Sequence, residues 1–148
     1  MSAQTILLPT ILLVLWSLVM LLWTVATRFP AIAKNMEKLR DFPVGGRGEL
    51  LNDVLPPKVM WKAHNYDHLL QQPTLFYATV FVLVALEQGN GTNTALAWAY
   101  LVSRIVHSLW QALINTVLPM RVALFSVSST ILIVLAVRAF WSAWTILL

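Results

Sequence analysis

The sequence predicts an all-α integral membrane protein, a four-helix bundle formed as one domain over residues 1–148. Hydrophobic residues make up 59% of the chain and charged residues only 11%, whereas soluble domains average about 25% charged residues. The hydrophobic residues gather in four stretches, each near the roughly 20 helical residues that cross a bilayer core. Continuous apolar runs such as Ile11–Leu15 exclude the alternating strands of a membrane barrel.

The first span is expected over residues 5–27. No basic residue precedes it and its apolar run is longer than that of a signal peptide, so we interpret it as a retained helix. The first loop, residues 28–58, is the one sizeable polar segment. Its Gly45–Gly48 stretch and Pro56–Pro57 favour turns and irregular structure.

Three further spans follow in the second part of the chain. They are expected over residues 59–86, 94–118 and 122–147, with a short turn after Leu86 and a tight corner at Pro119–Arg121. Pro73 is expected to kink the second span. The basic first loop and Arg121 fall on the same side of the membrane, which the positive-inside rule assigns to the cytoplasm.

This topology also explains the formal net charge of +4, because the basic residues concentrate in and beside the first loop. The expected partner is therefore the lipid bilayer, and no nucleic acid is predicted. The chain has no cysteine, so disulfides, thiolate metal sites and a cysteine nucleophile are excluded. Any thiol chemistry must come from a bound thiol.

Polar residues at membrane depth are costly and tend to face a cavity or another helix. On the third span, Arg104, His107, Gln111 and Asn115 fall within roughly 80° of one another at helical spacing. Arg104 lies too deep to reach either surface easily, so it requires an anionic or strongly polar partner. For Gln111 and Asn115 taken alone, a role in holding helices together is the favoured interpretation.

The second span carries another polar face near its cytoplasmic end. This face consists of His64, Asp67, His68 and Gln71, with Asn65 and Gln72 beside it. Together with Arg121, it is expected to ring one cavity suited to a small anionic, polar ligand. His64 and His68 are four residues apart and could bind a metal with Asp67, but such helix-end pairs are usually interfacial, and no metal site is predicted.

Two segments together resemble a known family. One is Lys62-Ala63-His64-Asn65-Tyr66-Asp67-His68 followed by Gln71-Gln72-Pro73-Thr74-Leu75-Phe76-Tyr77, and the other is Arg104-Ile105-Val106-His107 followed by Gln111, Asn115 and Pro119-Met120-Arg121. They are similar to helices of the MAPEG family, the membrane-associated proteins in eicosanoid and glutathione metabolism. The bacterial branch looks closest, which implies a bacterial inner membrane.

The resemblance implies a homotrimer that binds glutathione between neighbouring subunits near the cytoplasmic side. It implies a glutathione-dependent transferase or peroxidase that acts on lipophilic electrophiles or hydroperoxides. By position, Arg121 is the residue expected to stabilise the glutathione thiolate. The other residues expected to bind glutathione are Arg104, His107, Asn65, Gln71, His64, His68 and Gln111.

Three positions depart from the family pattern. Lys62 stands where an arginine is usual, Gln71 where a glutamate is expected, and Phe125 where some members have an aromatic hydroxyl. A guanidinium and an ammonium group are not interchangeable in binding carboxylates, and a missing glutamate removes a partner for the glutathione ammonium. The alternative is therefore a non-catalytic MAPEG-like trimer that binds lipid or a partner membrane protein.

Overall fold

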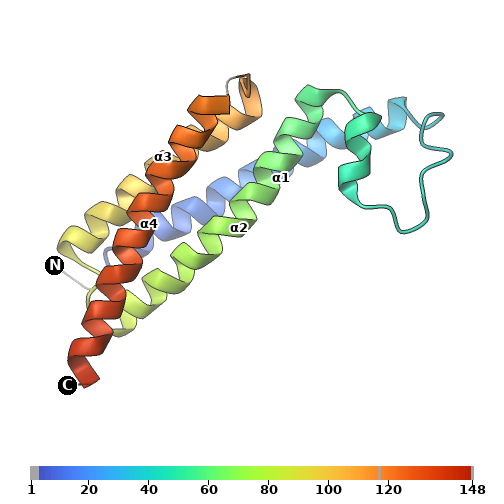
Figure 1. Ribbon diagram of the computed structural model, residues 1–148. Helices are drawn as coiled ribbons and strands as arrows, with labels where there is room; N and C mark the ends of the chain where they lie inside the picture. Colours follow the sequence, from blue (N-terminus) through green and yellow to red (C-terminus); the bar gives the residue numbers. More distant parts are fainter. Residues whose placement is uncertain (1–3, 117, 148) are drawn as a thin grey trace.

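The computed structural model describes residues 4–116 and 118–147. Residues 1–3, Val117 in the expected third span, and Leu148 lie outside the described residues. The long helices are α1 (Leu7–Lys34), α2 (Pro57–Ala85), α3 (Gly91–Leu113) and α4 (Leu118–Leu147), and a short 3₁₀ helix, η1, spans Gly48–Asp53 (Figure 1). The expected all-α class is confirmed.

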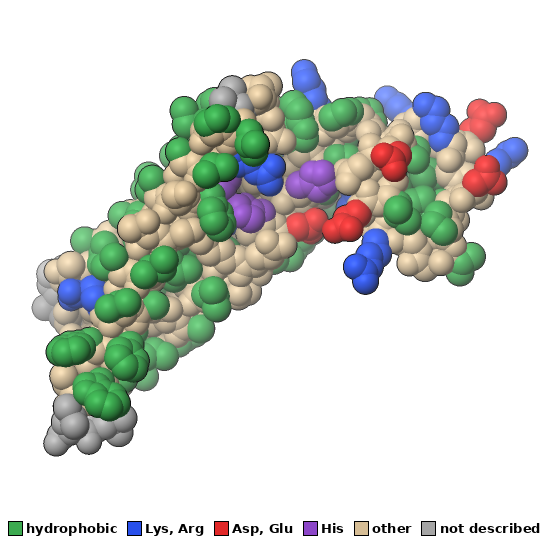
Figure 2. Space-filling view, viewed as in Figure 1, with side chains coloured by type: hydrophobic (Ala, Val, Ile, Leu, Met, Phe, Trp, Pro, Cys, Tyr) green, Lys and Arg blue, Asp and Glu red, His purple; other side chains and the backbone are tan. Residues whose placement is uncertain are grey.

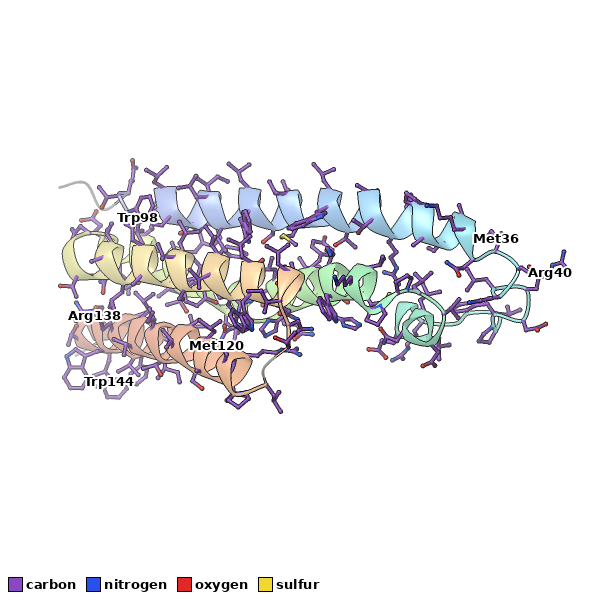
Figure 3. The ribbon with its side chains drawn as sticks, turned by 90° about the horizontal axis from the view of Figure 1, so that it is seen from above. Met36, Arg40, Trp98, Met120, Arg138 and Trp144 are labelled. Carbon is purple, nitrogen blue, oxygen red and sulfur yellow. The ribbon has the colours of Figure 1, made fainter. Side chains whose placement is uncertain are left out.

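The long helices run back and forth along one axis, and the first loop projects from one end (Figure 1). Met36 and Arg40 lie at this loop end, whereas Trp98, Arg138 and Trp144 lie toward the opposite end (Figure 3). The start of α1, the turn between α2 and α3, and the end of α4 therefore share the end opposite the loop.

Helices α2 and α3 form the centre of the packing. Helix α1 contacts α2 and α3, and α4 also contacts α2 and α3, while no contact joins α1 to α4 in the described part of the chain. The buried core takes side chains from all four, including Leu13, Phe76, Tyr100 and Leu135. The rings of Phe76 and Tyr100 stack with centroids 4.4 Å apart, which fixes α2 against α3.

Three helices, α1, α2 and α4, are long and apolar enough to cross a membrane. Large apolar side chains cover their outward faces, among them Leu22, Phe81 and Ile133, each more than 60% exposed. A soluble protein rarely exposes so much apolar surface, whereas lipid chains would cover it. Helix α3 has 23 residues and is not among these three, and its buried face carries polar side chains such as Arg104 and His107.

Some helix ends differ from the bounds expected from the sequence. Helix α1 continues past residue 27 to Lys34. Helix α3 ends at Leu113 because the backbone N–H of Asn115 turns back to the carbonyl of Trp110, with a φ of 42° at Asn115. Asparagine tolerates this left-handed conformation better than most residues. Asn115 therefore lies off the helical face expected to include it, and Pro119–Arg121 belongs to the first turn of α4 instead of the corner.

The first loop folds back onto the ends of α1 and α2. Leu55, Met60 and Ala63 form a small buried cluster, and partly buried side chains of α1 pack against it. Arg28 Nη2 donates a hydrogen bond of 3.0 Å to the carbonyl oxygen of Gly48. The loop is thus attached to the helices by apolar contacts and by one guanidinium.

Candidate functional site

Arg104 is fully buried between helices, with 1% of its surface exposed. Its Nη1 donates to Oε1 of Gln72 at 3.1 Å, and its Nη2 donates to the carbonyl oxygen of His68 at 3.0 Å. Both partners are neutral oxygens of α2. The sequence predicted an anionic or strongly polar partner for Arg104. Its partners in the structure are polar groups of the same chain.

Gln72 connects three helices around this guanidinium. Its Oε1 also accepts from Ser128 Oγ of α4 at 3.3 Å, and its Nε2 donates to Ser129 Oγ at 2.7 Å. Tyr100 of α3 lies at the same oxygen, with its hydroxyl 3.5 Å away. We call Arg104, Gln72 and Ser128 the arginine cluster. Arg104 Nε is buried without a hydrogen-bond partner, but both of its Nη atoms and the amide of Gln72 are bonded within the chain. The cluster therefore holds α2, α3 and α4 together.

A second polar junction joins α1, α2 and α3. Asn65 Nδ2 donates to Ser108 Oγ at 2.7 Å, and Trp16 Nε1 donates to the same oxygen at 3.0 Å. Asn65 and Ser108 are both buried. The amide nitrogen of Asn65, a residue expected to bind glutathione, is thus engaged within the chain.

A pocket of about 190 Å³ opens beside the arginine cluster, and we call it the histidine pocket. It is lined by His68, His107, Leu118, Arg121, Val122 and Phe125. The rings of His68 and His107 meet edge to face with centroids 5.0 Å apart, and the His68 and Phe125 rings are 5.6 Å apart. In Figure 2, histidine and basic side chains lie together at the apolar surface. The structure therefore brings together Arg121, His68 and His107.

The polar atoms around this pocket differ from those of the arginine cluster. His107 is 1% exposed, and neither of its ring nitrogens has a hydrogen-bond partner. Gln111, one turn further along α3, is equally buried and also makes no hydrogen bond of standard geometry. Buried polar atoms are nearly always paired, and exceptions call for an explanation such as a ligand or a catalytic role. Gln111 interacts with His68 and does not line the pocket, so His107 is the buried group available to a polar ligand there.

The expected single cavity is divided in two. His64 and Asp67 line another pocket, of about 280 Å³, which also includes Arg28 and Arg47. Gln71 lines neither of these two pockets and is exposed. No group of three or more His, Asp or Glu side chains is placed to hold a metal ion within residues 4–116 and 118–147.

From the sequence, Gln72 was expected only beside the polar face of α2. Neither Ser108 nor Ser128 was expected to contact the polar residues. Gln72 lies four residues after His68, which is the helical spacing that places both side chains on one face. That spacing was the available signal for Gln72. The two serines carry no comparable signal, because serine is common on helices of every kind.

The fold and these pockets define a class, an all-helical membrane protein with a buried polar layer between its helices. A comparison with protein families matches residues 6–141, nearly the whole chain, to the MAPEG family. The chain belongs to this family, as its sequence predicted. Neither the comparison with curated proteins nor that with solved structures found a match.

Proposed function

We propose that this protein is a membrane-embedded, glutathione-dependent transferase or peroxidase that acts on lipophilic electrophiles or hydroperoxides. The observation that carries the proposal is the position of Arg121 in the histidine pocket, where buried His107, half-buried His68 and apolar side chains line the same space. Family membership supports the choice of glutathione. A guanidinium at a partly apolar site attracts a thiolate more strongly than one in water does.

The residues of the histidine pocket suit the thiol end of glutathione. Arg121 is half-buried and contributes a positive charge, which favours the thiolate over the neutral thiol. His107 contributes hydrogen-bonding atoms that have no partner in the chain. Leu118, Val122 and Phe125 contribute apolar surface for a lipophilic second substrate. In this site, Arg121 holds the reactive sulfur, and the apolar wall limits access of water.

The pocket volume supports a site shared between subunits. Small-molecule sites usually measure about 300–1,000 Å³, and the histidine pocket of one chain has about 190 Å³. We therefore propose a homotrimer in which a neighbouring subunit completes the site. Helix α4 offers an apolar surface for such contacts, because only 17% of its most apolar window is buried in the single chain.

We further propose that all four long helices cross the membrane as a four-helix bundle, with the first loop in the cytoplasm of a bacterial inner membrane. Helix α3 packs against each of the other three long helices, which cover its polar face. Buried Arg104 and His107 are consistent with a span whose polar side chains face protein instead of lipid.

The deciding experiment is glutathione binding by the purified protein in nanodiscs, measured by calorimetry together with the ultraviolet absorbance of the thiolate. We expect saturable binding and a thiolate signal. Arg121→Ala should weaken binding about 10- to 100-fold, the value of one hydrogen bond to a charged group, and remove the thiolate signal. Arg121→Lys, which keeps the charge, should retain part of both. Unchanged glutathione binding and an unchanged thiolate signal in Arg121→Ala would contradict the assignment of Arg121.

One observation favours the alternative, a non-catalytic trimer that binds lipid or a partner membrane protein. Arg104 and Asn65, both expected to bind glutathione, donate hydrogen bonds within the chain. The alternative predicts no heat of glutathione binding at saturating concentration, together with a trimer that keeps lipid in native mass spectrometry. The enzyme proposal predicts that glutathione binds to that same trimer.

A further inference from the structure

The pocket at the loop end is distinct from the histidine pocket. It has a volume of about 280 Å³ and is built from three segments, namely α1 with Arg28, the loop with Arg47 and Glu49, and α2 with His64 and Asp67. We call it the loop-end pocket. The proposed thiol chemistry assigns it no role, because Arg121 and His107 line the other cavity.

The loop-end pocket contains both positive and negative side chains, and these do not form ion pairs with one another in the described residues. Two guanidinium groups and two carboxylates line it, with His64 beside them. No ion pair joins Arg28, Arg47, Glu49 or Asp67 to one another in the described residues. Arg28 donates a hydrogen bond from Nη2 to the Gly48 carbonyl, and this bond positions the loop. The other N–H groups of Arg28 remain available to a ligand.

The floor of the pocket is apolar and firmly packed. Met60 and Ala63 line it and are 3% and 2% exposed, and both belong to the cluster that attaches the loop. A ligand here meets charged groups on its sides and buried aliphatic groups beneath. The pocket therefore exists because the loop folds back, not because single surface residues happen to be close.

Its location is the polar end of the membrane-crossing region. Arg28 is the first charged residue of the chain, following an apolar stretch of α1. Most of the acidic and basic side chains in this view lie around the loop end, whereas apolar side chains are spread along the body of the molecule (Figure 2). Lipid headgroups occupy this level of a bilayer, outside its hydrocarbon core.

We propose that the loop-end pocket binds the headgroup of a phospholipid that carries both a phosphate and a primary ammonium. Arg28 and Arg47 bind the phosphate, because guanidinium forks match phosphate oxygens. Asp67 and Glu49 accept hydrogen bonds from the ammonium, which has three donors. A phosphate-only headgroup leaves the carboxylates facing an anion, and a quaternary ammonium has no N–H to donate to them.

The test measures binding of short-chain phospholipids to the full-length protein in detergent by calorimetry. We expect phosphatidylethanolamine to bind more tightly than phosphatidylglycerol or phosphatidylcholine. Arg47→Gln should weaken binding of phosphatidylethanolamine and phosphatidylglycerol about fivefold, the effect of one partly exposed charged contact. Asp67→Asn should weaken binding of phosphatidylethanolamine alone.

Arg40→Gln is the matched control, because Arg40 also lies in the loop but at the outer end of the molecule (Figure 3). It should leave binding unchanged. Equal binding of all three lipids, or no effect of Arg47→Gln and Asp67→Asn, would overturn the proposal. Equally tight binding of glycerophosphoethanolamine, which lacks acyl chains, would overturn the lipid as the ligand and indicate a soluble phosphate compound.

The outcome is separable from that of the glutathione proposal. Arg121→Ala removes the proposed thiolate contact and leaves the loop-end pocket intact, so its headgroup binding should be normal. If glutathione displaces the headgroup, and Arg47→Gln weakens glutathione as much as the lipid, the pocket belongs to the glutathione site and the headgroup proposal is wrong.

Discussion

The arginine cluster and the histidine pocket lie on successive turns of α3, yet their polar groups behave differently. Arg104 donates to two oxygens of α2, and Gln72 adds two bonds to α4. His107, three residues further on, is equally buried and has no partner at either ring nitrogen. Within the arginine cluster, only Arg104 Nε lacks a partner, whereas His107 has no partner at either nitrogen. We call the first layer closed and the second layer open.

The difference separates two uses of polarity inside a membrane protein. A satisfied layer stabilises the packing of helices and fixes which helix faces which. An unsatisfied layer costs stability, and proteins retain such groups mainly where a ligand or reaction uses them. Arg104 therefore has mainly a structural role, and His107 belongs to the candidate site. The sequence had placed both residues in one group.

The largest expected effect comes from opening the closed layer. Gln72→Leu removes the side-chain acceptor of Arg104 and leaves a buried positive charge with only the His68 carbonyl. We expect a loss of about 3 kcal/mol in the free energy of unfolding, because a buried charge without its partner is costly. The measurement is reversible unfolding of the purified protein in detergent.

Two variants control for this result. Gln72→Glu keeps an acceptor and adds an opposite charge beside Arg104, so it should preserve stability. Gln71→Leu changes the adjacent glutamine, which is exposed, and should stay within about 0.5 kcal/mol of the wild type. If Gln72→Leu is as stable as Gln71→Leu, the arginine cluster does not hold the helices together.

A smaller effect is expected at the junction of α1, α2 and α3. Ser108→Ala leaves the donors of Asn65 and Trp16 without their acceptor. Hydrogen bonds between membrane helices are worth less than in a soluble core, so we expect a loss of about 1 kcal/mol. Glutathione affinity should not change, because Ser108 does not line the histidine pocket. Loss of binding with unchanged stability would assign this junction to the site.

Helical spacing predicted the shared face of α3 correctly for three residues and wrongly for Asn115, which lies beyond the end of the helix. Arg104, His107 and Gln111 are each 1% exposed, because positions three and four apart must lie on one side of a helix. The family also followed from the spacing of residues in two segments. Both predictions depend only on local geometry or on linear pattern.

The partners of these residues could not be predicted in the same way. Gln71 and Gln72 are adjacent in sequence and chemically identical, yet only Gln72 faces Arg104, because successive helical residues point about 100° apart. Which of them faces inward depends on how α2 is rotated against α3. The division of the expected cavity arose from the folded loop, whose docking through Leu55 and Met60 is a tertiary contact.

A substitution at His107 distinguishes a ligand-binding role of this residue from a structural one, although its expected effect on stability is small. His107→Leu replaces a buried, unpartnered ring with an apolar side chain of similar size, so it removes a desolvation cost and leaves no new unpaired group behind. We expect the free energy of unfolding to stay equal or to rise by about 1 kcal/mol, while glutathione affinity falls. Stability and calorimetry on the same sample check both. A stability loss as large as that of Gln72→Leu would mean that His107 has a structural role, and the distinction between the closed and open layers would fail.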